Sequence, residues 1–145
     1  MATRRSVLIG ATAFAITGRA QAKPAPVMLY KNPGCDCCEG YADFLRTHGF
    51  TVNVKETPEL DELSRKAGIP SELHGCHTAF HGNYVVEGHV PVEAINKLLA
   101  ERPRIKGISL PGMPEGSPGM GGTKSAPFTI LAIGDDGEAE TFATL

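Results

Sequence analysis

Apolar and polar positions along the first hundred residues follow two different patterns, which together predict the order of the secondary structure elements. Short apolar or alternating runs indicate strands, whereas stretches with apolar residues every three or four positions indicate helices. The predicted strands are residues 26–30, 50–55, 78–80 and 84–86, and the predicted helices are residues 37–48, 57–67 and 91–101. The resulting order, βαβαββα, indicates an α/β protein with a central mixed sheet flanked by helices, and it is the order of a thioredoxin-like fold.

A segment without periodicity, residues 102–127, follows the last of these helices. It is rich in proline and glycine, so we expect a long loop. Residues 128–133 and 140–145 are separated by a turn sequence, which predicts a C-terminal β-hairpin. The loop carries Met113 and Met120, although no helix or strand there requires large apolar side chains. Their thioethers are candidate ligands for cuprous copper, and the alternative is that they fill gaps above the core.

The N-terminal residues have the pattern of an export signal. Two arginines at positions 4 and 5 precede an apolar run and a small-residue cleavage site that ends at Ala22. The paired arginines favour a twin-arginine signal over an ordinary secretory one. We therefore expect residues 1–22 to be removed, and residues 23–145 to form one thioredoxin-like metal-binding domain in the periplasm, with no membrane span in the mature form. Cleavage changes the formal net charge from −2 to −5, which argues against nucleic acid as a partner.

The four cysteines bear most directly on function. Two structural disulfides are the default for an exported chain. Three of the cysteines, however, are crowded into Cys35-Asp36-Cys37-Cys38, so at most one pairing can reach Cys76 without a strained link between adjacent cysteines. A disulfide framework stays an alternative, and a functional thiol site is the favoured interpretation.

The cysteine motif falls where a predicted strand turns into a predicted helix, and the positive end of a helix stabilises thiolate. Cys35 and Cys38 have the C-x-x-C spacing of thioredoxin-like redox sites, so they are the predicted catalytic pair. Cys37 adds a third thiolate, which would compete with this pair in disulfide exchange and which suits the binding of a soft metal. Cys76 precedes the third predicted strand, in a loop that a thioredoxin-like fold brings beside the helix start. Residues 74–78 lack the proline that supports substrate docking in most thioredoxin-like oxidoreductases.

Two histidines are candidates for the same site. His77 follows a candidate ligand directly, and it either binds the metal or faces solvent. His89 precedes the last predicted helix, where it could bind the metal or orient a ligand. We expect His48, His74 and His81 at the surface.

Several motifs, in the same order along the chain, resemble a known family. They are residues 30–38, 76–78, 84–91 and 111–114. Over nearly the whole mature chain, the sequence resembles the CopG-type family of periplasmic copper-resistance proteins, long catalogued as a domain of unknown function. The resemblance implies a thioredoxin-like fold and a copper site built on the C-x-C-C motif, with a multinuclear cuprous cluster as one form of that site. The metal-binding residues that it implies are Cys35, Cys37, Cys38, Cys76, His77, His89, Met113 and Met120.

The favoured function is copper binding in support of copper resistance, in which thiolates hold cuprous ions and cysteine pairs exchange electrons as disulfides form. The expected partners are copper ions, other periplasmic copper-handling proteins and an electron donor. Two alternatives stay open: a thiol–disulfide oxidoreductase that acts without metal, and a passive copper chaperone. Zinc also fits the ligand count. Adjacent Cys37 and Cys38, however, are expected to have difficulty in reaching one ion together.

Overall fold

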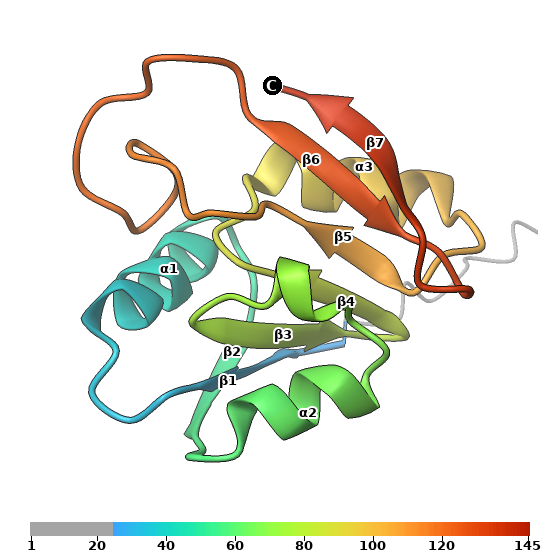
Figure 1. Ribbon diagram of the computed structural model, residues 1–145. Coiled ribbons are helices and arrows are strands. Elements are labelled where there is room, and N and C mark those ends of the chain that lie inside the picture. Colours follow the sequence, from blue (N-terminus) through green and yellow to red (C-terminus); the bar gives the residue numbers. More distant parts are fainter. Residues whose placement is uncertain (1–24) are drawn as a thin grey trace, which may run out of the picture.

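A seven-stranded mixed sheet organises residues 25–145, the part of the chain that the computed structural model describes (Figure 1). The predicted signal peptide, residues 1–22, lies outside the described residues. The strands are β1 (Val27–Lys31), β2 (Val52–Glu56), β3 (His77–His81), β4 (Tyr84–Glu87), β5 (Gly107–Ser109), β6 (Thr129–Ile133) and β7 (Ala139–Thr144). The helices are α1 (Asp36–Thr47), α2 (Leu60–Lys66), α3 (Val92–Glu101) and the short 3₁₀ helix η1 (Ser71–Leu73).

The sheet has the strand order β2-β1-β3-β4-β5-β6-β7. β1 is parallel to β2 and antiparallel to β3, and β3 and β4 form an antiparallel hairpin. β5 is parallel to β4 and antiparallel to β6, which continues into the C-terminal hairpin with β7. The predicted order, the mixed sheet and the terminal hairpin are confirmed, and this arrangement is compatible with a thioredoxin-like fold.

One part of the predicted loop over residues 102–127 was wrong, because Gly107–Ser109 form β5. All three residues of this strand are buried, and it joins β4 to β6 in the sheet. A Cβ atom on Gly107 would collide with the carbonyl of Val85, so glycine allows the two strands to approach. Three residues, two of them glycine and serine, carry too little pattern to be recognised as a strand.

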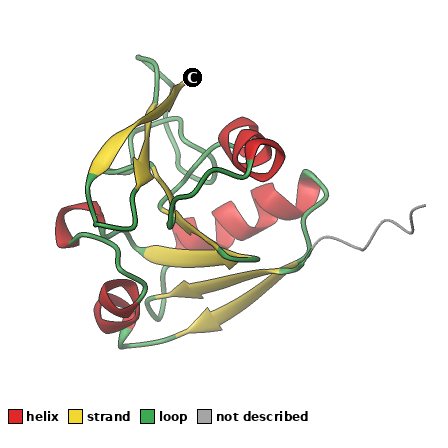
Figure 2. Ribbon diagram, turned by 90° about the vertical axis from the view of Figure 1, so that its right-hand side faces the viewer, coloured by secondary structure: helices red, strands yellow, loops and turns green. Residues whose placement is uncertain are grey.

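The helices cover the two faces of the sheet unequally (Figure 2). α1 and α3 pack on one face, where buried residues such as Tyr41, Leu45 and Leu98 join the main core. α2 and η1 lie on the other face, where Ile69 and Leu73 belong to a smaller cluster. No helix within residues 25–145 has both the length and the apolar character needed to span a membrane.

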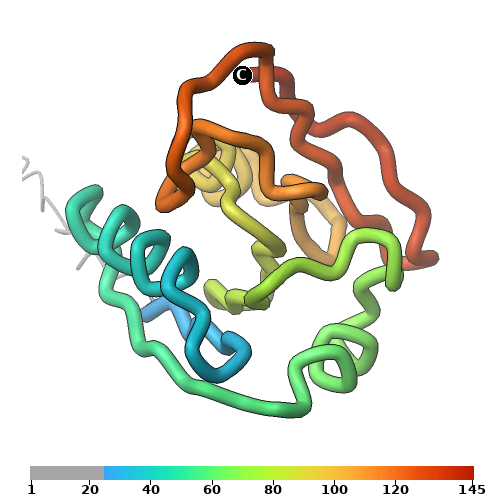
Figure 3. The backbone as a smooth tube through the Cα atoms, turned by 60° about the vertical axis from the view of Figure 1, so that its left-hand side comes forward, coloured from blue at the N-terminus to red at the C-terminus, as the bar shows by residue number. Residues whose placement is uncertain are grey.

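The strand directions bring three chain segments to one end of the sheet. Lys31, the last residue of β1, pairs with His77, the first residue of β3. Glu87, the last residue of β4, pairs with Thr78. The loop that follows β5, orange in Figure 3, lies on the same side as α1. The start of α1 also follows β1 at this end, so it meets the residues around His77 and Glu87.

Candidate metal centre

The C-x-C-C motif lies at the start of α1, as predicted. Gly34, in the turn after β1, has a φ of 72°, a left-handed conformation that glycine adopts without strain. Cys35 is the N-cap residue of α1, and Cys37 and Cys38 lie in its first turn. Cys38 is fully buried, whereas Cys35 and Cys37 are half-buried. One helical turn therefore presents three sulfur atoms at the end of the sheet.

A buried lysine fixes the turn that carries this motif. Lys31 Nζ lies 2.9 Å from Glu56 Oε1 and 3.2 Å from Glu39 Oε1, and only 2% of Lys31 is exposed. Glu56 Oε1 also accepts the Gly34 N–H at 3.5 Å. The hydrogen bond to Glu56 is the main cause that raises the pKa of Lys31, so the ammonium form is retained. Because β1, β2 and α1 each contribute one charged residue, these ion pairs hold the start of α1 against the sheet.

Cys76 supplies a fourth sulfur from the segment that precedes β3. Its carbonyl accepts the Asn32 N–H at 3.4 Å. Its Sγ lies 3.3 Å from Cys38 Sγ and 3.6 Å from Cys37 Sγ, and Cys37 Sγ lies 3.4 Å from Cys35 Sγ. All four sulfur atoms lie within 4.8 Å of one another. We call these four sulfur atoms the thiol cluster, and the structure brings together every cysteine that the sequence predicted for the site.

The thiol cluster contains one disulfide, between Cys35 and Cys38, whose Cα atoms are 5.5 Å apart. Cys37 and Cys76 are free. Each free thiol lies beside one sulfur of the disulfide, since Cys37 is near Cys35 and Cys76 is near Cys38. A thiolate breaks a disulfide by attacking one of its sulfur atoms, and this requires the closeness that the two free thiols have to the bridge. The disulfide must first take up two electrons before all four thiolates can bind a metal.

Two buried imidazoles face Cys76. His77 Nε2 donates a hydrogen bond to the Gly88 carbonyl at 3.1 Å, and His89 Nδ1 donates one to the Pro118 carbonyl at 2.6 Å. The other ring nitrogens then carry no hydrogen, and they lie 3.7 Å (His77 Nδ1) and 3.5 Å (His89 Nε2) from Cys76 Sγ. These two imidazoles and Cys76 offer donor atoms within 4.8 Å of one another. Metal-binding histidines are commonly oriented by such carbonyl partners.

Tyr41 packs against both imidazoles from α1. Its ring centroid lies 4.7 Å from that of His77 and 5.2 Å from that of His89, and its hydroxyl donates to the Val90 carbonyl at 2.9 Å. Burial lowers the pKa of His77 to about 3 and also lowers the pKa of His89. Both rings are therefore neutral near pH 7, which is the form that binds a metal.

The Cys76 thiol differs from the thiols of the helix start. Burial raises the pKa of Cys76 to about 12, and the neighbouring Cys37 thiol adds to this effect. Cys76 lies outside α1, so the helix end that favours thiolate does not act on it directly. A metal ion that binds Cys76 near neutral pH must therefore displace a proton.

Met113 and Met120 are half-buried in the loop after β5. This loop contacts the start of α1, because a Cβ atom on Gly40 would lie 3.1 Å from the Gly119 carbonyl oxygen. The same loop provides the Pro118 carbonyl that binds an imidazole. The loop therefore lies against the metal centre, and the role of the two methionines as ligands stays a prediction.

The other three histidines lie in different surroundings. His48 is exposed, as expected, and His74 is half-buried with its Nε2 3.1 Å from the Ile69 carbonyl. The expectation of a surface site for His81 was wrong, since only 6% of this residue is exposed. His81 lies on β3, inside the sheet, and the Phe50 ring packs edge-on at 5.6 Å from it.

Glu87 is a residue at the centre that the sequence pattern did not reveal. It is 1% exposed, and its Oε1 accepts the Gly75 N–H at 2.6 Å, directly before Cys76. Burial raises the pKa of Glu87 to about 7, and the Gly75 N–H opposes this shift. In the sequence, Glu87 directly follows the apolar pair Val85-Val86. A polar residue in that place is common at the end of a strand, so it did not stand out as a site residue. Tyr41 was missed as well, because its helical spacing is typical of a core residue.

Glu87→Gln is expected to change how stability depends on pH. The pKa of Glu87 is near 4.5 in the unfolded chain and about 7 in the folded one, so the folded state holds the extra proton between these values. The free energy of unfolding then falls as the pH rises from 4.5 to 7, by about 1.4 kcal/mol per unit and about 3 kcal/mol in all. Gln cannot ionise, so the variant should gain that amount over the wild type.

Urea unfolding of both reduced, metal-free proteins at pH 5 and pH 8 measures this difference. The buried histidines titrate in both proteins, so their contribution cancels. A difference between the two proteins that stays constant with pH would contradict the assigned pKa of Glu87.

The donor atoms of the centre fit a soft metal ion. A tetrahedral site with metal–sulfur bonds of about 2.3 Å has sulfur atoms about 3.8 Å apart. The separations from Cys76 to Cys38 and to Cys37 are 3.3 and 3.6 Å. Cys37 and Cys38 therefore both lie close to Cys76, and the binding of one ion by these adjacent thiols stays untested.

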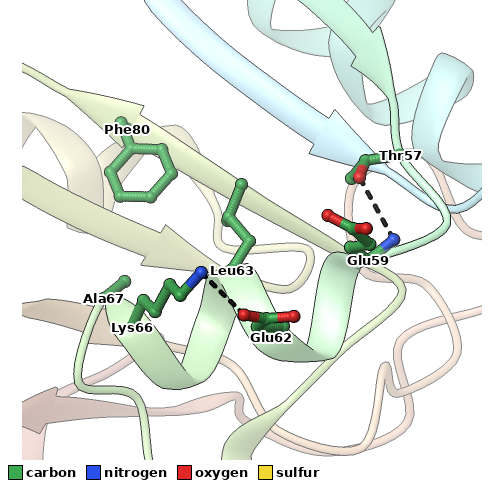
Figure 4. Close-up of a pocket in the computed structure, with 7 residues that line it drawn as sticks. All are labelled: Thr57, Glu59, Glu62, Leu63, Lys66, Ala67 and Phe80. Carbon is green, nitrogen blue, oxygen red and sulfur yellow. Dashed lines mark hydrogen bonds and ion pairs between the residues drawn. The ribbon is translucent and has the colours of Figure 1, made fainter.

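A pocket on the surface of the described residues lies away from the centre. It has a volume of about 410 Å³, lies between α2 and β3 and is lined by Thr57, Glu59, Glu62, Leu63, Lys66, Ala67 and Phe80 (Figure 4). Its lining includes none of the predicted site residues.

Fold and site together define an α/β protein with a cysteine–histidine centre that can hold a soft metal ion. Two solved structures, "Copper resistance protein copG- Form 1" and "Copper resistance protein copG- Form 2", each match with a TM-score of 0.78 and 31% sequence identity. They cover 85% of this chain, and the matches span 98% and 99% of those chains. The chain belongs to the CopG family of copper resistance proteins.

A family model agrees with this assignment. It is described as "Protein of unknown function, DUF411", and it matches residues 73–120. This range contains Cys76, both imidazoles and both loop methionines, and it begins after the C-x-C-C motif. No curated protein matches the chain. The predicted resemblance to the CopG-type family is confirmed.

Proposed function

We propose that the mature chain, residues 23–145, is a periplasmic protein that binds cuprous copper and thereby supports copper resistance. The observation that carries this proposal is the convergence of four cysteine sulfurs and two neutral imidazole nitrogens at one end of the sheet. Soft thiolate ligands favour cuprous copper over hard cations. The two similar solved structures are of a copper resistance protein, which supports copper as the metal.

The proposed chemistry extends to a change in the oxidation state of copper. When the thiolates of Cys35 and Cys38 form their disulfide, they release two electrons, which reduce two cupric ions to two cuprous ions. The return to two thiols needs two electrons and two protons. A periplasmic protein that carries a reduced dithiol is the class of partner that supplies both.

The close spacing of the thiol cluster supports binding of more than one ion. A thiolate can bridge two cuprous ions, and each free thiol lies within 3.6 Å of another cysteine sulfur. Met113 and Met120 are the proposed additional ligands from the adjoining loop. In this form the centre is a small multinuclear cuprous cluster.

An anaerobic titration tests this function. The reduced mature protein is titrated with cuprous copper against a cuprous-specific chelator, and metal and thiols are counted. We expect tight binding of more than one ion per chain, and we expect Cys37→Ser to lose most of it, because Cys37 touches both Cys35 and Cys76. Thr47→Ser, an exposed change near the far end of α1, is the matched control. Failure of the wild-type protein to compete with the chelator would refute the proposal.

A second candidate function is thiol–disulfide exchange with protein substrates. The specific observation is the Cys35–Cys38 disulfide at a helix start, in which Cys35 is half-buried and Cys38 is fully buried. An enzyme of this kind reduces an insulin-type disulfide without metal. A passive copper chaperone binds copper but leaves its oxidation state unchanged. Assays of disulfide reduction and of cupric reduction, run on the same preparation, separate the three functions.

A further inference from the structure

The segment that carries Cys76 lies just beyond the paired part of the β3–β4 hairpin. The last pair of the hairpin is Thr78 with Glu87, and β1 pairs with β3 as far as His77, so strand pairing does not reach Gly75 and Cys76. On the β1 side, the Cys76 carbonyl accepts the Asn32 N–H at 3.4 Å, which is a long hydrogen bond. The chain around Cys76 therefore depends on other contacts for its exact path.

Glu87 supplies the shortest of these contacts. Its Oε1 accepts the Gly75 N–H at 2.6 Å, which is a short hydrogen bond. Two further contacts, His77 with the Gly88 carbonyl and Cys76 with His89, join the same two segments. The contact from Glu87 is the first of these three along the chain, and it binds the amide of Gly75, the residue directly before Cys76.

The burial of Glu87 argues for a specific role. Only 1% of the residue is exposed, and within residues 25–145 no ion pair includes it. A buried carboxyl group without a basic partner, charged or neutral, destabilises a protein unless its hydrogen bonds compensate. An apolar residue here would pack at least as well, but it would leave the Gly75 N–H without this acceptor.

We propose that Glu87 is a positioning residue, whose Oε1 holds the Gly75 amide and thereby fixes the Cys76 thiol against Cys38 and the imidazoles. The proposal deepens the proposed function and rests on it for the copper readout alone. Ligands must be held to within about 0.5 Å for a metal site to work, and Gly75 and Cys76 lie outside the paired strands. Glu87 itself does not bind the metal.

The first test compares Glu87→Gln with Glu87→Leu. Gln keeps an acceptor for the Gly75 N–H, and Leu removes it. In the reduced, metal-free protein, mass spectrometry follows the alkylation of Cys76 relative to Cys37. We expect Glu87→Leu to raise this ratio about tenfold, since the loss of this short buried hydrogen bond frees the segment, and Glu87→Gln to stay within about threefold of the wild type.

The Cys76-to-Cys37 ratio excludes a merely structural effect. A variant that unfolds globally exposes both thiols together. Its alkylation ratio is then that of the unfolded chain, which is the same for all variants. A ratio in Glu87→Leu equal to that of the wild type would overturn the proposal. So would a ratio in Glu87→Gln as high as in Glu87→Leu, because the acceptor would then not be what matters.

The second test changes the donor instead of the acceptor. Gly75→Pro removes the N–H, and the preceding residue, His74, already has the extended conformation (φ −61°, ψ 133°) that a following proline requires. Gly75→Ala is the matched control, because it keeps the N–H and its Cβ would lie 3.4 Å from Glu87 Oε1, an ordinary contact. We expect about a tenfold rise in the alkylation ratio for proline and no change for alanine. If Glu87→Leu fails to fold, this pair decides the question.

Cuprous affinity is measured on the same variants. We expect Glu87→Leu and Gly75→Pro to lower it roughly tenfold or more, with Glu87→Gln and Gly75→Ala near the wild type. If the wild-type protein binds no copper, the proposed function fails, while the metal-free alkylation ratio still tests the role of Glu87. If copper binds and no variant changes its affinity or the alkylation ratio, only the positioning role is refuted.

Discussion

Replacing Cys76 with serine is expected to lower the affinity for cuprous copper more than any other single substitution in the centre. Cys76 belongs to both groups of donor atoms, the thiol cluster and the group that it forms with His77 and His89. Its removal therefore separates the imidazoles from the remaining sulfurs. Loss of a residue that merely orients a ligand lowers metal affinity about 10- to 100-fold, so the loss of this shared ligand should lower it at least about 100-fold.

Competition with a cuprous-specific chelator measures this effect, and His89→Gln is the comparison. His89 belongs to one donor group only, so its replacement should lower the affinity about tenfold. Cys76→Ser removes no large buried side chain, and its melting temperature in the reduced state should stay near that of the wild type. An affinity for Cys76→Ser equal to or above that of His89→Gln would show that the two donor groups do not share Cys76.

The second large effect is expected from Gly119→Ala, in the loop after β5. Gly119 has a φ of 76°, and an added Cβ would lie 2.7 Å from Tyr41 Cα and 2.8 Å from the Gly40 carbonyl carbon. The loop must then move away from α1 and take the Pro118 carbonyl away from His89. We expect a loss of about 2 kcal/mol in the free energy of unfolding and a fall in cuprous affinity of about 10-fold or more.

Gly121→Ala is the matched control for this substitution. An added Cβ at Gly121 meets no atom within 4 Å, and its φ is not among the positive ones. Denaturant unfolding and the copper competition assay are run on both variants. If Gly119→Ala binds copper as tightly as Gly121→Ala, the contact between the loop and α1 has no part in the centre.

The sequence predicted most of the fold, because the apolar positions that recur with a clear period in the sequence are the buried positions of the strands and helices. The helix predicted at residues 37–48 is α1, Asp36–Thr47, and its buried residues recur at helical spacing. β5 could not be predicted in this way. Its three residues pair with β4 and β6, partners far along the chain, and pairing of this kind leaves no local pattern.

The candidate site was predicted where chemistry is concentrated in the side chains and missed where it depends on the path of the backbone. The structure brings together the four cysteines and two histidines that the sequence predicted, since few other residue types bind soft metals. Glu87 was not found, because its contact with Gly75 arises only when β3 and β4 pair. The burial of His81 likewise follows from the central place of β3 in the sheet.

The partners of the two imidazoles have a consequence for how the centre tolerates mutation. His77 and His89 each donate to a main-chain carbonyl, of Gly88 and Pro118 respectively, and not to a side chain. Any amino acid at position 118 offers the same carbonyl oxygen. Alanine scanning would therefore not detect these two hydrogen bonds. The path of the main chain sets the tautomer of each imidazole, whichever side chains its neighbours carry.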